Sequence, residues 1–319
     1  MSTEPHIHYL TRQEVDIARW DDCICRSANR LIYGLHFHLD HMTGGQWNAL
    51  VSGDYEAVMP LTWRRKYGVT YLAQPAFTQQ TGIFSPSRVT PQTIDAFLSA
   101  ASAHYRFAEI FLNYGNPGSA LEARINLLLS LDKPYDTLYA EYSDNHRRNL
   151  RKTTGLVYTL NIARTEALNA WRTLHGGKNL ATLGDEEYRR FDTLCQSMER
   201  ENNLLLRAAL DAGDQYLAIA LLFRDASRLY LLQFTTLPQG RDMAASHFLI
   251  DRLIREFAGQ PLQLDFEGSD DPGVARFYSG FGAAGQPYFF WRHNRLPWPA
   301  RLFKGPVSGV PPPAQDPPE

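Results

Sequence analysis

Apolar and polar positions follow two different periods along this chain, and the two periods predict a mixture of strands and helices. In the first part, strands are expected at 31–39, 47–53, 55–65 and 108–115, and helices at 11–29 and 91–105. Gly53-Asp54 is a turn signal that predicts a hairpin between two of these strands. Pro91 stands near the start of its helix, where a missing N–H has no cost.

The second part of the chain repeats the same alternation of element types. Strands are expected at 126–131, 157–163, 203–211, 215–225, 228–236, 261–268 and 287–293. Helices are expected at 135–155, 165–177, 185–202, 246–257 and 274–282. A loop at 237–245 connects one of these strands to the helix that begins at Ser246.

A short internal sequence repeat divides these elements into two similar blocks. Residues 71–74 (YLAQ) and 230–233 (YLLQ) each begin a strand that is followed by a loop, a helix and another strand, and each is preceded by a hairpin. Two matching blocks predict a duplicated mixed α/β unit. We therefore expect an N-terminal domain at 1–138 and a C-terminal domain at 139–305. The proline-rich segment 306–319 cannot form helix or sheet and is expected to be disordered.

Composition narrows the function classes. The chain has 319 residues, of which 44% are hydrophobic and 21% charged, as in an ordinary globular protein. Its 32 basic and 34 acidic side chains give a net charge of -2, so we expect no DNA partner. Three cysteines without a CxxC pair or a leader sequence predict a cytoplasmic protein. The longest apolar run, 216–223, is far shorter than the ~20 residues of a transmembrane helix.

One motif in the second block carries a family resemblance. The strand at 228–236, the loop and helix at 237–257 and the strand at 261–268 are followed by Phe277-Tyr278-Ser279-Gly280-Phe281-Gly282. This order, with an ending like FYxxxGF, resembles the GNAT acyltransferase superfamily. The two-domain plan and the segment at 142–152 are similar to the Fem-type branch, which includes peptidyltransferases that lengthen cell-wall peptides. The resemblance implies an α/β fold of two tandem GNAT-like mixed-sheet domains with helices on both faces, and a role at the bacterial cell envelope.

The resemblance also implies a phosphate-binding loop ahead of the helix at 246–257. A helix N-terminus offers free N–H groups and a positive dipole end to a pyrophosphate. The residues expected to hold the donor are Gln233, Phe234, Thr235, Gly240, Arg241, Met243, Ala244, Ala245 and Ser246. The family's central glycine is replaced by Asp242, whose carboxylate would repel a phosphate. Acyl-CoA is thus a candidate donor substrate rather than a tightly bound cofactor. The corresponding loop at 77–90 has no phosphate pattern, so the N-terminal domain is expected to be degenerate.

Three residues are candidates for catalysis. Tyr278 stands where GNAT enzymes place a proton donor for the leaving thiolate, although its neighbours also suit an aromatic packing residue. Asp265 and Glu267 alternate along a strand and so share a face, where they could deprotonate an amine. An ion-paired strand end is the alternative for both, and Glu267, nearer the turn at Gly268, is the better candidate.

Two clusters could bind further ligands. Arg147, Arg148, Arg151 and Lys152 form two basic columns at i,i+4 spacing. They could bind a diphosphate, a lipid head group or a tRNA acceptor stem, or could form a solvated face paired with acidic neighbours. His36, His38 and His41 lack zinc-type spacing, and we expect no metal there.

These observations predict an N-acyltransferase. It would transfer an acyl or aminoacyl group from an activated donor to an amine acceptor, both of them small molecules or, for the donor, an aminoacyl-tRNA. The alternative is a non-catalytic GNAT-fold binding protein whose phosphate loop has been lost, and Asp242 favours it.

Overall fold

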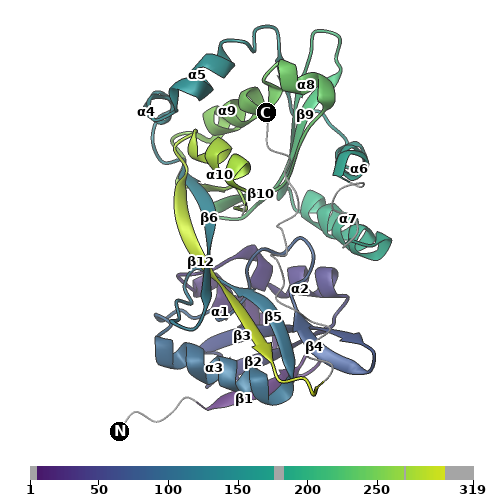
Figure 1. Cartoon of the computed structure of the whole chain (residues 1–319), viewed down its shortest axis with the longest axis vertical. Coiled ribbons are helices and arrows are strands. Elements are labelled where there is room, and N and C mark those ends of the chain that lie inside the picture. Colours follow the sequence, from purple (N-terminus) through teal and green to yellow (C-terminus); the bar gives the residue numbers. More distant parts are fainter. Residues whose placement is uncertain (1–5, 176–182, 269–270, 299–319) are drawn as a thin grey trace. The chain divides into compact units, whose positions relative to one another are not determined.

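The computed structural model describes residues 6–175, 183–268 and 271–298 (Figure 1). Within these limits, residues 6–124 and 287–298 form one compact unit, unit 1, and residues 125–286 form a second, unit 2. The units do not coincide with the domains predicted at 1–138 and 139–305, because 125–138 lies in unit 2 and the last strand returns to unit 1. The segment 306–319, predicted to be disordered, lies outside the described residues.

Unit 1 is a sheet in the order β1-β2-β3-β4-β5-β12 with helices. Its elements are β1 (Ile7–Thr11), α1 (Ile17–Arg26), the 3-10 turn η1 (Ile32–Gly34), α2 (His36–Thr43), β2 (Trp47–Ser52), β3 (Ala57–Lys66), β4 (Val69–Ala73), α3 (Pro91–His104), β5 (Phe107–Leu112) and most of β12 (Ala284–Asn294).

Unit 2 is a sheet in the order β6-β11-β10-β9-β8-β7. Its elements are most of β6 (Glu122–Ser130), α4 (Tyr135–Ala140), α5 (Asp144–Leu150), β7 (Val157–Thr159), α6 (Arg164–His175), α7 (Asp185–Arg200), β8 (Leu204–Leu210), β9 (Tyr216–Arg224), β10 (Arg228–Thr236), α8 (Pro238–Asp242), α9 (Ala245–Phe257), β11 (Gln263–Asp265) and α10 (Pro272–Ser279). In Figure 1, α9 and α10 lie on one face of this sheet and α6 and α7 on the other.

The core of unit 2 explains why α9 forms where the sequence predicts it. Phe248, Leu249, Leu253 and Ile254 recur at helical spacing and are all buried against the sheet. The strands beneath are buried on both faces, and every residue of β10 is buried, as the continuous apolar run of β9 indicates. The mixed α/β class predicted from the sequence is confirmed.

The predicted repeat of element order is also confirmed. In unit 1, β3 and β4 form an antiparallel hairpin, and α3 connects β4 to the parallel strand β5. In unit 2, β9 and β10 form the hairpin, and α9 lies between β10 and the parallel strand β11. Each unit thus contains a hairpin, a crossover helix and a parallel strand.

Local predictions were wrong at several places. The predicted strand 31–39 is the turn η1 followed by the helix α2, whose capping glycine, Gly44, has a φ of 64°. The predicted helix 135–155 is two short helices, since Ser143 accepts a bond from the His146 N–H and begins a new helix. The predicted strand 261–268 pairs only as Gln263–Asp265.

Candidate functional site

The strand β10 changes its pairing on both sides at its midpoint. Its register against β9 shifts between Leu231 and Gln233, so Leu232 is an extra residue, a β-bulge. Its parallel ladder with β11 ends at Tyr230, whereas β10 continues to Thr236. Beyond the bulge, the edge of β10 that faces β11 has no ladder partner among the described strands. Peptide groups on such an edge can bind a ligand.

Two side chains just beyond the bulge are buried without hydrogen-bond partners. Gln233 is 3% exposed, and neither its amide nitrogen nor its amide oxygen has a partner in the described residues. The hydroxyl of Thr236, 7% exposed, is likewise without a partner there. Burial of a polar group without a hydrogen bond costs about 1–3 kcal/mol. A polar group that stays buried in a folded protein despite this cost is a candidate for ligand binding. The predicted donor-binding residues Phe234 and Thr235 lie on the same strand and are also buried.

The predicted phosphate loop is in part a helix. Residues 238–242 form α8, and Ala244, at a φ of 52°, turns the chain into α9. Gly240 is buried, and a Cβ there would lie 2.2 Å from the Leu217 carbonyl oxygen. The glycine therefore allows α8 to pack closely on β9. The side chains of Arg241, Asp242 and Met243 are exposed. The loop therefore presents one cation and one carboxylate to solvent ahead of α9.

The first turn of α9 carries a histidine that the sequence analysis did not single out. Ala245 and Ser246 are buried, and His247 is 5% exposed. Asn149 Nδ2 donates to His247 Nε2 at 3.2 Å, so the neutral ring carries its proton on Nδ1, which has no partner in this part of the structure. Burial, with His146 and Lys152 nearby, lowers the pKa of His247 to about 3. Its spacing to Asn149 in the sequence offered no signal.

A second histidine connects α5 to α10. His146 Nε2–H donates to the Phe277 carbonyl at 2.8 Å, and the Ser143 hydroxyl lies 2.9 Å from Nδ1. The two imidazoles, of His146 and His247, meet edge to face at 4.7 Å. A Cβ at Gly280 would come within 2.2 Å of the His146 ring, so this glycine, within the motif at 277–282, makes room for the histidine. The contacts hold α5, α9 and α10 together.

Both carboxylate oxygens of Asp265 have partners. Its side chain is 1% exposed and forms an ion pair with Arg228 at 2.6 Å, where the arginine side chain is 8% exposed. Its other oxygen accepts from Asn126 Nδ2 and from the backbone N–H of Glu267, both at 2.9 Å. The alternative of an ion-paired strand end therefore describes Asp265.

Glu267 lies outside the regular strand. It has a φ of 63°, followed by Gly268 at 52°, so the alternation that predicted a face shared with Asp265 does not reach it. A left-handed backbone is strained for a residue with a side chain, and such strain clusters at functional sites. Its side chain is 3% exposed, and burial raises the pKa of Glu267 well above its ordinary value. A buried carboxyl of this kind is suited to proton transfer.

Tyr278 contacts Phe266, the residue that precedes Glu267. Its ring stacks on Phe266 with centroids 4.3 Å apart, and it is 1% exposed. Burial raises the pKa of Tyr278 far above its ordinary value, so the phenol keeps its proton throughout the neutral range. The neighbouring Phe277 packs edge to face on His247 at 5.0 Å. These ring contacts link α10 to β11 and to the first turn of α9.

The four basic residues singled out in the sequence, at 147, 148, 151 and 152, do not form one continuous helix face. Arg147 is paired with Asp144 at 2.7 Å and donates to the Ala140 carbonyl, and Arg148 donates to Asn145. The helix ends before Arg151 and Lys152, which lie on the turn that follows α5. Of the four, only Arg151 lines a pocket described below.

The three histidines considered as a metal cluster, His36, His38 and His41, have separate partners, because 36–43 is a helix. His36 pairs with Asp21, His38 is buried against the Thr78 hydroxyl at 2.9 Å, and His41 binds the Phe37 carbonyl. No group of three or more metal-ligating side chains occurs in the described ranges. The helices described there include none that is both long and apolar enough to cross a membrane.

Comparison with known proteins shows what this fold is similar to. Residues 140–273 match the family model of an acetyltransferase (GNAT) domain. The crystal structure of FemX is similar with a TM-score of 0.56 and 13% identity, over 89% of this chain and 96% of that one. A conserved protein of unknown function from Bacteroides thetaiotaomicron is similar with a TM-score of 0.51 and 11% identity, over 89% and 99%.

A third structure, the C-terminal domain of a putative lysylphosphatidylglycerol synthetase from Agrobacterium fabrum, has a TM-score of 0.48 and 12% identity, over 88% of this chain and 92% of that one. None of the curated proteins matches the sequence. Identities this low are informative about fold alone. Residues 140–273 thus match the model of a GNAT-type acetyltransferase domain, and the fold of the chain is similar to that of FemX.

Proposed function

We propose that unit 2 catalyses transfer of an acyl or aminoacyl group from an activated donor to an amine, at the edge of β10 beyond its bulge. The observation that carries this proposal is the open edge beside Gln233, a buried amide whose two polar atoms have no partner in the described residues. A donor that contains amide and carbonyl groups would satisfy both the edge and the side chain.

The reaction assigns one task to each group. The amine nitrogen attacks the donor carbonyl, and a C–N bond forms. The carbonyl oxygen becomes an oxyanion that accepts hydrogen bonds from N–H groups of β10 near Gln233 to Thr235. Glu267 accepts the proton that the amine loses. As the tetrahedral intermediate collapses, the bond to the leaving group breaks and Tyr278 protonates that group. A proton returned through Glu267 or water restores the phenol.

The environment of Tyr278 bears on the donor. A phenol with a raised pKa gives its proton more readily to an alkoxide, a strong base, than to a thiolate, whose conjugate acid has a pKa of about 8.5. This favours an ester donor, such as an aminoacyl-tRNA, over a thioester. The N-terminus of α9 favours any donor with a phosphate, and the exposed Asp242 opposes it.

A non-catalytic binding protein is the second candidate, and Asp242 is the observation that favours it. A donor screen separates three possibilities: an enzyme that uses a thioester, an enzyme that uses an aminoacyl ester, and a non-catalytic binding protein. Thiol release from an acyl-CoA panel with mixed amines identifies a thioester donor, and ribonuclease-sensitive transfer from charged tRNA identifies an aminoacyl ester. Ligand-induced thermal stabilisation without turnover of either donor would support the binding protein and overturn the proposal.

Variants of Gln233 test the site itself once a donor is known. Gln233→Met keeps the shape but removes the unpaired amide, so we expect kcat/KM to fall at least ~10-fold, about 1.4 kcal/mol, with no loss of stability. The matched control is Gln263→Met on β11, whose amide already donates to Ser130 at 3.2 Å and whose loss should leave activity unchanged. Equal effects of the two substitutions on activity would contradict the assignment.

Tyr278→Phe tests the proton donor separately. The ring contact with Phe266 persists in this variant, so we expect a folded protein whose kcat falls by about 10²-fold or more. The assigned acid is wrong if the variant keeps full activity with a confirmed donor and acceptor.

A further inference from the structure

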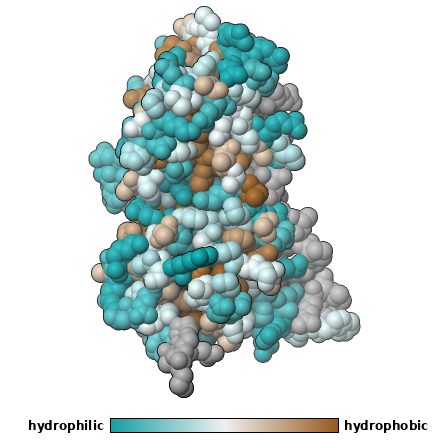
Figure 2. All heavy atoms as spheres, turned by 90° about the vertical axis from the view of Figure 1, so that its left-hand side faces the viewer, coloured by the Kyte–Doolittle hydropathy of each residue, from teal (hydrophilic) through white to brown (hydrophobic). Residues whose placement is uncertain are grey.

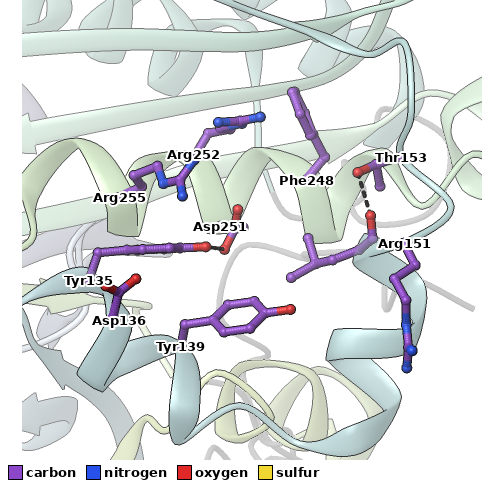
Figure 3. Close-up of a pocket in the computed structure, with 10 residues that line it drawn as sticks. Tyr135, Asp136, Tyr139, Arg151, Thr153, Phe248, Asp251, Arg252 and Arg255 are labelled. Carbon is purple, nitrogen blue, oxygen red and sulfur yellow. Dashed lines mark hydrogen bonds between the residues drawn. The ribbon is translucent and has the colours of Figure 1, made fainter.

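A pocket of about 380 Å³ lies in unit 2 between α4, the end of α5 and α9 (Figure 3). Its volume is within the range of small-molecule sites, about 300–1,000 Å³. None of the residues that line it belongs to β10, β11 or α10, so it is distinct from the acyl-transfer site. Figure 2, which looks onto the side of unit 2 that carries α4 and α5, shows small apolar areas among hydrophilic side chains.

Three arginines from two elements stand around this pocket. Arg151 follows α5, whereas Arg252 and Arg255 lie on successive turns of α9. None of the three forms an ion pair with a carboxylate in the parts of the chain that are described. By contrast, Arg147 on α5 is paired with Asp144 at 2.7 Å. The pocket thus collects guanidinium groups whose charge is not neutralised by a salt bridge.

Aromatic rings hold two of these guanidinium groups in place. The Cζ of Arg255 lies 4.3 Å from the centre of the Tyr135 ring, and that of Arg252 lies 5.0 Å from the Phe248 ring. Arg252 Nε is buried and has no acceptor among the described residues. A donor of this kind, fixed over a ring and lacking an acceptor, is ready to bind an anionic oxygen.

Two acidic side chains also line the pocket, and they do not cancel its positive charge. Asp136 is exposed on the first turn of α4. Asp251 is 7% exposed and accepts the Tyr135 hydroxyl at 2.8 Å, and burial raises the pKa of Asp251. Three guanidinium groups therefore line the pocket together with two carboxyl groups, one exposed and one buried and bonded to Tyr135.

The remaining lining is apolar. Tyr139, Leu150 and Phe248 contribute rings and an aliphatic side chain. In Figure 3, the ring of Tyr139 extends from α4 into the space below Asp251, while Arg151 stands toward the outside. A ligand with an organic body and a charged end would match this division.

We propose that this pocket binds a phosphate ester, with the phosphate held by Arg252 and Arg255 and the organic part packed against Tyr139 and Leu150. Guanidinium forks match phosphate oxygens, and a dianion can accept donors from two guanidinium groups on successive turns of α9. A cationic ligand would be repelled by these groups.

Calorimetric titration with phenyl phosphate tests the proposal, with inorganic phosphate, benzoate and benzylamine as comparison probes. We expect phenyl phosphate to bind more tightly than each of the others, because it alone combines a dianion with a ring. Its affinity should fall as salt is raised. Absence of phenyl phosphate binding, or stronger binding of benzylamine, would overturn the proposal.

Substitution of the arginines tests whether phenyl phosphate binds in this pocket. Arg252→Gln and Arg255→Gln should each weaken phenyl phosphate binding at least ~10-fold, whereas Arg151→Gln, at an exposed position that follows α5, should weaken it less. The matched control is Arg200→Gln on α7, an exposed arginine whose guanidinium donates to the Gln196 carbonyl. Equal affinity in all four variants and the parent protein would refute the site. Because acyl transfer does not depend on this pocket, loss of the probe does not bear on the function proposed above.

Discussion

The buried pair of Asp265 and Arg228 supports the most specific stability prediction. Asp265→Asn keeps the size of the side chain and an oxygen that can accept from Asn126 and from the Glu267 N–H. It removes the negative charge that lies 2.6 Å from the Arg228 guanidinium. The perturbation is thus a single charge at a site where neither partner is more than 8% exposed.

The magnitude follows from that burial. Loss of one partner of a buried ion pair leaves the other charge without compensation in a poorly polar environment, at a cost of about 3–5 kcal/mol. The total stability of a folded domain is about 5–15 kcal/mol, so the substitution should remove a large part of it. The double variant Arg228→Met with Asp265→Asn removes the remaining charge but keeps the oxygen that accepts from Asn126 and from the Glu267 N–H. We therefore expect it to regain most of the loss.

Urea denaturation, with an unchanged m-value as the check on two-state unfolding, measures the effect. With m of about 3 kcal/mol/M, Asp265→Asn should lower the midpoint by about 1 M or more. Asp242→Asn, at an exposed position, is the control and should shift stability by less than about 0.5 kcal/mol. The reasoning is refuted if Asp265→Asn matches this control, or if the double variant is no more stable than the single one.

Three further predictions rest on particular contacts. Gly240→Ala places a Cβ 2.2 Å from a backbone oxygen of β9, so it should lower stability by about 1–3 kcal/mol in a denaturation measurement; an unchanged midpoint would contradict the packing role. Glu267 has a raised pKa, so the folded state loses stability as pH rises above the ordinary carboxyl range, and Glu267→Gln should be the more stable protein at pH 8 but not at pH 4. Burial lowers the pKa of His38 to about 3, so the unfolded chain takes up a proton there first as pH falls below about 6.5. His38→Gln should therefore lose less stability between pH 6.5 and pH 4 than the parent protein, and equal losses would exclude this histidine as a cause.

The candidate site was predictable from the sequence where one element carries it. The strand at 228–236, the helix beginning near Ser246 and the motif around Tyr278 each have a local signature, namely an apolar run, a helical stripe and a spacing of aromatic residues with glycine. These signatures are set by the hydrophobic period and by conformational preference, which act over a few residues.

The residues that the sequence analysis missed, His247, Asn149 and His146, lack such a signature. Their roles arise because α5, α9 and α10 meet, through the bond from Asn149 to His247 and the contact between the two imidazoles. The same is true of Asp265, whose partner Arg228 lies on the neighbouring strand. Contacts between elements depend on register and packing, which no local pattern contains.

The chain's own pattern of apolar residues was sufficient to determine the mixed α/β class, the repeated order of hairpin, helix and strand, and the position of the motif at 277–282. Only the tertiary structure decided which acidic residue is ion-paired, where β10 departs from β11, and which arginines share a pocket. The physical reason is that periodicity reports whether a residue faces a core, whereas charge pairing, burial of a polar group and the end of a β-ladder depend on the neighbours that folding brings from distant parts of the chain.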